Sequence, residues 1–188
     1  MGLDMYLSRK KYVGAQYEHR NVNGEIKINI GDKELPIDFN KVSYIEESVG
    51  YWRKANQIHN WFVENCQDGV DNCEEHYIPL EKLEELLNIC KEIKEKAILK
   101  EGKIQNGQRL TENGWEPILE DGKYIENPEV CEELLPTTDG CFFGSTDYDE
   151  YYMMDIENTI KILEPLIEEE KSLNNSGIYC DYYYQSSW

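Results

Sequence analysis

The stretch YWRKANQIHNWFVENC contains the side chains best suited to binding chemistry. We expect it to form one helix, on which Arg53, Asn56 and Asn60 share a flank because their spacings are three, four and seven. An arginine fits a phosphate or a carboxylate, and an asparagine amide both donates to and accepts from an amide or a base edge. The row predicts a site for a polar ligand. The alternative is that the row hydrogen-bonds a neighbouring loop, such as the one after Gly144.

Three further residues of this stretch need an interpretation. Lys54 would add a second positive charge to the site. Trp61 falls nearly opposite the apolar face of the expected helix, so it is either covered, for which the segment 101–135 is available, or exposed for stacking. His59 falls among apolar neighbours, which favours a hydrogen-bonded core histidine over ligand contact or catalysis.

A second candidate element is Gly144-Ser145-Thr146, which precedes an expected helix from about Asp147. Free backbone N–H groups at a helix start bind anions, so Ser145 and Thr146 join the candidate ligand-binding residues. The alternative is capping, because Thr146 with Asp149 three residues later is a variant of the capping box.

No catalytic motif emerges from the sequence. There is no GxSxG, HExxH, P-loop or GxGxxG pattern in the right context, so we assign no catalytic residue and expect no cofactor. His59 and Cys66, with Cys73-x-x-His76, offer zinc-type ligands, but their spacing matches no zinc signature, and no metal site is predicted. An enzyme of unknown class, centred on His59 or a carboxylate cluster, remains an alternative.

These residues must be positioned by an α+β domain spanning 1–188. Alternating apolar residues in MGLDMYLSRKKY and in the tail GIYCDYYYQSSW predict two strands that pair with each other. EIKINIGDKELPID predicts an early hairpin that completes a small antiparallel sheet. About three helices should cover this sheet: the stretch quoted first, PLEKLEELLNICKEIKEKAIL with its apolar stripe, and the helix from about Asp147.

Residues 101–135 differ in character from the rest of the chain. Asn-Gly occurs twice and Asp-Gly once between short apolar runs, which predicts an inserted hairpin arm. The segment is also acidic.

The net charge is −19, and it is unevenly distributed. Residues 1–60 hold nine Lys/Arg and eight Asp/Glu, whereas residues 61–188 hold ten Lys/Arg and thirty Asp/Glu. Phosphates would be repelled, so direct nucleic-acid binding is not expected. Solubility is one explanation; mimicry of a polyanion such as DNA, blocking a basic host protein through an acidic 112–170 surface, is the other.

The expected cellular location follows from two features that the sequence lacks. No run of 18 apolar residues occurs, and the first residues have no apolar signal region. We therefore expect a cytoplasmic protein that does not contact a membrane.

The segments YWRKANQIHNWFV and LLPTTDGCFFGSTDYDEYY, with the MGLDMYL start, resemble a family of uncharacterised bacteriophage and prophage proteins of Gram-positive hosts. The resemblance covers most of the chain, least well at 101–135. It implies phage origin and expression in the host cytoplasm, and it transfers no catalytic residues. By analogy with phage lifestyle, we expect a small non-enzymatic binding protein that modulates or counters a host process, with a small polar or phosphate-containing, nucleotide-like ligand.

Overall fold

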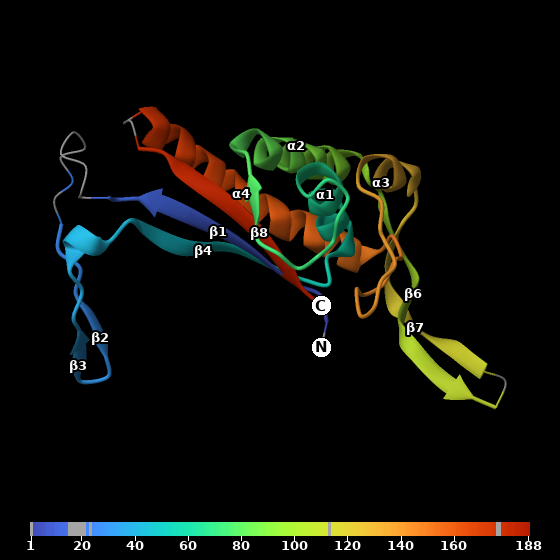
Figure 1. Ribbon diagram of the computed structural model, residues 1–188. Helices are drawn as coiled ribbons and strands as arrows, with labels where there is room; N and C mark the ends of the chain where they lie inside the picture. Colours follow the sequence, from blue (N-terminus) through green and yellow to red (C-terminus); the bar gives the residue numbers. More distant parts are fainter. Residues whose placement is uncertain (1, 15–21, 23, 113, 176–177) are drawn as a thin grey trace.

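Strands from the two ends of the chain lie side by side at the centre of a four-stranded antiparallel sheet (Figure 1). The computed structural model describes residues 2–14, 22, 24–112, 114–175 and 178–188. The strands of this sheet are, in spatial order, β4 (Tyr44–Arg53), β1 (Asp4–Tyr12), β8 (Cys180–Ser187) and β5 (His76–Ile78). The expected pairing of the N-terminal and C-terminal strands is thus confirmed, and the fold is α+β as predicted.

The helices pack on one face of this sheet. In the described part of the chain they are α1 (Asn56–Cys66), α2 (Leu80–Lys96), α3 (Glu129–Leu134) and α4 (Glu150–Asn175), with a short 3-10 turn at Phe39–Lys41. In Figure 1 α2 and α4 run along the same side of the sheet. There are four helices where about three were expected, because the end of the predicted arm forms α3.

The core lies between the sheet and this helical layer. Inward-facing residues alternate along β1 and recur every three or four residues along the helices, as the patterning predicted. The largest fully buried side chains are Trp52, Tyr182, Tyr184, Phe62, Leu3, Met5, Leu7, Ile58, Ile78, Leu83, Leu86 and Ile93.

Two hairpins extend away from the helical layer (Figure 1). The early hairpin consists of β2 (Ile28–Ile30) and β3 (Lys33–Leu35) around the predicted Gly31-Asp32 turn. It forms a separate two-stranded sheet and does not join the main sheet, which corrects one part of the prediction. The second hairpin is the expected arm, formed by β6 (Leu99–Thr111) and β7 (Gly114–Ile125).

The stretch that we expected to be one helix from Tyr51 begins as the end of a strand and becomes helical only from Asn56. Tyr51 and Arg53 belong to β4, and α1 begins only at Asn56. Within β4 the side chains alternate, with Trp52 in the core and its two neighbours exposed. The Lys54 N–H donates to the Leu3 carbonyl at 2.8 Å, so pairing with the first residues of the chain continues to the point where the backbone turns.

Candidate ligand-binding cleft

A cleft of about 610 Å³ opens where β4, α1, the β6–β7 arm and the start of α4 meet. This volume lies within the usual range for small-molecule sites. Its lining residues are Arg53, Lys54, Gln57, Gln105, Asn106, Gly107, Gln108, Thr137, Gly144, Ser145, Asp147, Asp149, Tyr151, Tyr152, Met154 and Asp155. Three of the seven predicted ligand-binding residues, Arg53, Lys54 and Ser145, therefore lie in one cleft.

Arg53 and Lys54 supply the positive charge of the cleft. The Arg53 side chain is 60% exposed, and its nearest carboxylate is that of Asp4, at 4.0 Å. Lys54 adopts a φ of +60°, a conformation that non-glycine residues rarely take. A Cβ on Gly144 would come within 3.1 Å of the Lys54 carbonyl oxygen, so a glycine is needed where the two backbones approach.

Asn56 positions the cleft wall and is not exposed to a ligand. Its amide nitrogen donates to the Ser145 carbonyl at 2.7 Å, and its side-chain oxygen accepts from the Thr138 N–H at 2.9 Å. The side chain is 1% exposed. The alternative stated for the predicted row, hydrogen bonding to the loop after Gly144, is therefore correct for Asn56.

Ser145 and Thr146 do not form a free helix N-terminus. The Ser145 hydroxyl donates to the Asp147 carboxylate at 2.9 Å and accepts from the Asp147 N–H at 3.1 Å. The Thr146 carbonyl accepts from the Thr137 hydroxyl at 3.0 Å, and Thr146 is not among the residues that line the cleft. The cap of α4 is Asp149, so the predicted Thr146 capping box is wrong.

Asn60 and Trp61 face away from this cleft. Asn60 lines a separate cleft beside His59, Asp71 and Trp188. The predicted row on one flank does not exist, because Arg53 lies on a strand and Asn60 on a helix. Trp61 is 6% exposed and packs edge-on against Phe62.

The cover over Trp61 includes a cation from α2. The Lys82 ammonium lies 6.0 Å from the centroid of the Trp61 ring. Burial was one of the two predicted alternatives, although the expected covering segment was the arm at 101–135. Stacking of a ligand on Trp61 is excluded by this burial.

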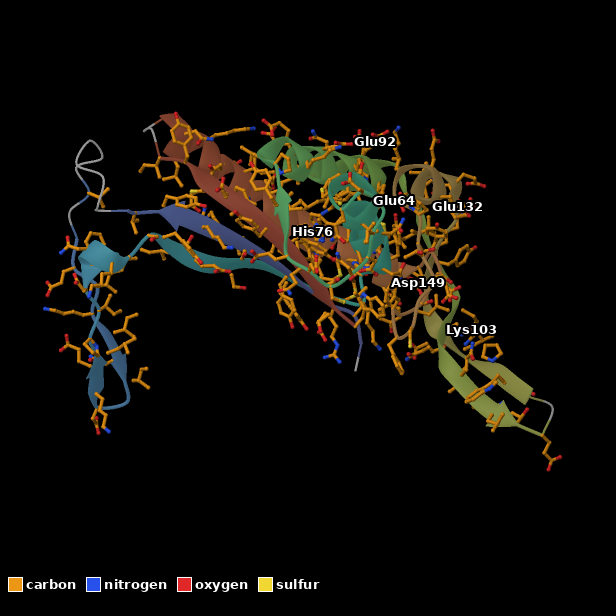
Figure 2. All side chains as sticks on the ribbon, in the orientation of Figure 1. Glu64, His76, Glu92, Lys103, Glu132 and Asp149 are labelled. Atoms are coloured by element: carbon orange, nitrogen blue, oxygen red, sulfur yellow. The ribbon has the colours of Figure 1, made fainter. Side chains whose placement is uncertain are left out.

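Asp149 combines a capping role with an unused oxygen. Its Oδ1 accepts from the N–H groups of Tyr151 and Tyr152, at 2.8 and 3.2 Å. Its Oδ2 is buried and has no hydrogen-bond partner among the described residues. Burial raises the pKa of this carboxyl. In Figure 2 Asp149 lies at the start of α4, where the helix meets the base of the arm, and Lys103 lies further along the arm.

Asp155 lies one helical turn and a half further along α4. Gln57, which is almost fully buried, donates from its amide to the Asp155 carboxylate at 3.1 Å. Burial raises the pKa of Asp155 to about 6, and the hydrogen bond from Gln57 opposes only part of that shift. The interior of the cleft therefore presents two carboxyl groups that would gain from hydrogen-bond donors.

The arm contributes an irregular segment to the cleft. Gln105 pairs with Leu119 and Gln108 pairs with Pro117, so β6 has an extra residue at this point. Gly107 has a φ of +100°. Asn106 and Gly107 form one of the Asn-Gly pairs that we interpreted as turn signals. In the structure this pair forms a β-bulge, a feature that often changes the direction of side chains beside binding sites. The bulge brings two glutamine amides to the cleft wall.

His59 is a buried structural histidine, as expected. Its Nδ1 is 2.8 Å from the Tyr184 hydroxyl and its Nε2 is 3.0 Å from the Asp71 carboxylate. Both ring nitrogens are therefore used within the protein. Among the described residues, no group of three or more His, Cys, Asp or Glu side chains is arranged to hold a metal ion.

Comparison with known proteins found no relative of this chain. A scan against protein-family models gave no match, and searches of curated proteins and of solved structures found no similar chain. Within the part of the chain that the structure describes, no helix is long and apolar enough to cross a membrane.

Several cleft residues were not identified as ligand-binding from the sequence. Asp149 was predicted as the capping-box partner of Thr146, and neither Asp155 nor Gln57 was among the predicted ligand-binding residues. Tyr152 and Asp155 are three residues apart on α4, and this spacing could have indicated that both side chains lie on the same face of the helix. The arm residues could not have been found, because nothing in the sequence shows which face of the arm meets α4.

Proposed function

We propose that the protein is a small, non-enzymatic binding protein whose cleft binds a nucleotide-like ligand. The observation that carries this proposal is the buried, unpartnered Oδ2 of Asp149 in the same cleft as Arg53 and Lys54. A buried polar atom without a partner costs free energy, and a ligand that donates a hydrogen bond to it recovers that cost.

The ligand must therefore carry two kinds of group. An anionic group, such as a phosphate, would interact with Arg53 and Lys54 at the mouth of the cleft. An N–H-bearing group, such as the amino or imino edge of a base, would donate to Asp149 or Asp155 inside the cleft. The side-chain amides of the arm can donate and accept around the same ring. A nucleotide carries both kinds of group within one small molecule.

The test is calorimetric titration with nucleoside monophosphates and dinucleotides of all four bases, together with the matching phosphate-free nucleosides. A ligand that binds through Arg53 should lose affinity in Arg53→Ala by about tenfold or more, since one charge-assisted hydrogen bond contributes roughly 1.5–3 kcal/mol. Arg109→Ala is the matched control, because Arg109 is an exposed arginine on the outer part of the arm, where it pairs with Glu116.

A second variant tests the interior of the cleft. Asp149→Asn keeps an oxygen to cap α4 and replaces the unpartnered oxygen by an NH₂ group. Affinity for a ligand whose base donates to Asp149 should fall by about tenfold, while thermal unfolding should show that the variant remains folded. Absence of binding by every nucleotide, or equal affinities for Arg53→Ala and Arg109→Ala, would refute the proposal.

The biological setting is part of the proposal. The resemblance of YWRKANQIHNWFV and FFGSTDYDE to phage and prophage proteins supports a phage-encoded protein in the cytoplasm of a bacterial host. There it would modulate or counter a host process by sequestering the ligand. A host cell carrying the gene should then tolerate an increase in that nucleotide, and cells carrying the Arg53→Ala gene should not.

A further inference from the structure

The face of the main sheet opposite the helices is covered with tyrosines. The residues on this face are Asp4, Tyr6, Ser8, Lys10 and Tyr12 of β1, with their cross-strand neighbours on β4, β8 and β5. Tyr6, Tyr12, Tyr44, Tyr51 and Tyr77 are between 42% and 54% exposed. Exposed large aromatic residues gathered on one face are typical of binding surfaces, where each ring offers contact area at little entropic cost.

These tyrosines form cross-strand pairs. Tyr6 and Tyr51 have ring centroids 5.5 Å apart. Tyr12 and Tyr44 are 6.1 Å apart, and Tyr77 and Tyr183 are 5.9 Å apart. Pairing between neighbouring strands restricts the rings before any partner arrives, so less side-chain entropy is lost on binding.

The protein itself shows how this face accommodates a cation. The Lys10 ammonium lies 3.9 Å from the centroid of the Tyr183 ring and 5.6 Å from that of Tyr44. It also pairs with the Glu75 carboxylate at 2.8 Å. One lysine thus binds here by combining ring faces with a carboxylate, which is the environment that arginine and lysine side chains prefer when partly desolvated.

Three carboxylates, those of Asp4, Glu46 and Asp181, lie on the same face. The Tyr51 hydroxyl donates to Asp4, and hydrogen bonding to that carboxylate raises the pKa of Tyr51 and keeps its hydroxyl neutral. Glu46 and Asp181 lie on either side of Lys10. With a net charge of −19, the protein repels nucleic acid and other copies of itself and attracts basic partners.

Both hairpins border the same side of the molecule. In Figure 1 β2–β3 and β6–β7 extend from opposite ends of the sheet, away from the helices. Each exposes apolar residues, among them Ile30 on β2 and the cross-strand pair Leu110 and Trp115 on the arm. Isolated two-stranded hairpins are marginally stable in water, so their exposed apolar side chains are suited to packing against a bound protein.

We propose that the tyrosine face is a docking surface for an arginine- and lysine-rich segment of another protein, held between the two hairpins. This surface is distinct from the nucleotide cleft, and Arg53 lies at the border between them. The basic segment places guanidinium or ammonium groups on the tyrosine rings and beside Asp4, Glu46 and Asp181.

The test uses a fluorescein-labelled 20-residue peptide of alternating arginine and glycine, followed by fluorescence anisotropy at physiological salt. Peptides with lysine or glutamate in place of arginine, and a single-stranded oligonucleotide, complete the panel. The variant Tyr6→Ala/Tyr51→Ala should bind the arginine peptide about tenfold more weakly. This variant has the same net charge as the wild type, so any loss reports the rings and not general attraction.

Two matched variants accompany it. Tyr124→Ala removes a comparably exposed tyrosine from β7, outside both the tyrosine face and the cleft lining, and should bind like the wild type. Tyr6→Phe/Tyr51→Phe keeps both rings and should retain most of the affinity. If the double alanine variant does not fold, hydroxyl-radical footprinting of the wild type replaces it: the bound arginine peptide should protect Tyr6, Tyr51 and Tyr77 and leave Tyr124 exposed.

Three results would overturn the proposal. Equal affinity of the wild type and the double alanine variant would show that net charge alone attracts the peptide. Oligonucleotide binding that depends on Tyr6 and Tyr51 would assign the face to nucleic acid. A dimer in sedimentation that is lost in the double alanine variant would assign it to a second copy of the chain. Loss of nucleotide binding in Arg53→Ala bears only on the cleft.

Discussion

The replacement Asp155→Asn should stabilise the protein, and the gain should depend on pH. The carboxyl of Asp155 is largely buried beside Gln57, and this burial raises its pKa from 3.8 to about 6. A raised pKa means that the folded state disfavours the charged form of the acid. The charge on Asp155 therefore lowers stability progressively as pH rises from about 4 to about 7. Asparagine has the same shape and still accepts the hydrogen bond from Gln57.

The size of the effect follows from the shift in pKa. A shift of about two units corresponds to about 3 kcal/mol, since each unit is about 1.4 kcal/mol. Linkage with these two pKa values gives a gain of about 3 kcal/mol at pH 7, about 1.6 kcal/mol at pH 5 and only about 0.6 kcal/mol at pH 4. The gain in the free energy of unfolding is constant above about pH 7, where Asp155 is ionised in both the folded and unfolded states of the wild type.

The assay is urea unfolding of the wild type and Asp155→Asn at intervals between pH 4 and pH 8, followed by circular dichroism. The control is Asp32→Asn, which removes the same charge from the exposed turn of the β2–β3 hairpin. Relief of the general negative charge would stabilise both variants equally. A gain for Asp155→Asn that is independent of pH, or no larger than that of the control, would refute the assignment of a desolvated carboxyl in the cleft.

Three further results are expected. Thr159→Val should destabilise the protein by about 1–3 kcal/mol in urea unfolding, because the buried Trp52 indole N–H loses its acceptor at 2.9 Å; Thr159→Ser keeps the acceptor and should cost less, since it loses only one buried methyl group. Gly144→Ala should cost about 1–3 kcal/mol, since the residue has a φ of +102° and the added methyl meets the Lys54 carbonyl; unchanged thermal stability would contradict this. Cys141, the exposed one of the six cysteines, should react first with a thiol reagent, and Cys141→Ser should abolish the fast phase.

The strands at the chain ends and helix α2 could be predicted because their patterns are strong and local. Alternation in MGLDMYL and the apolar stripe of α2 each require one buried face, and only a strand and a helix, respectively, provide it. The last residues of β4 were wrongly predicted as helix, because Tyr51, Trp52 and Arg53 fit a helical period over so short a length. Pairing with β1, which lies more than forty residues earlier in the chain, decided in favour of a strand.

The candidate site could be predicted only in part. Arg53, Lys54 and Ser145 were identified because charged and hydroxyl residues are recognisable by type. Asn56 was assigned to a ligand although its amide holds the loop at 138–145, since an asparagine has the same hydrogen-bonding groups for either role.

The sequence by itself determined the fold class, the hairpins and the strong negative charge of this protein, because composition and periodicity are properties of neighbouring residues. Only the tertiary structure decided which polar groups lie together. Asp149 at the start of α4 and Asp155 within α4 line the same cleft as Arg53 of β4, because the sheet, α1 and the arm meet there. The tyrosine face likewise exists only because residues from strands far apart in the sequence are brought into register on one side of the sheet.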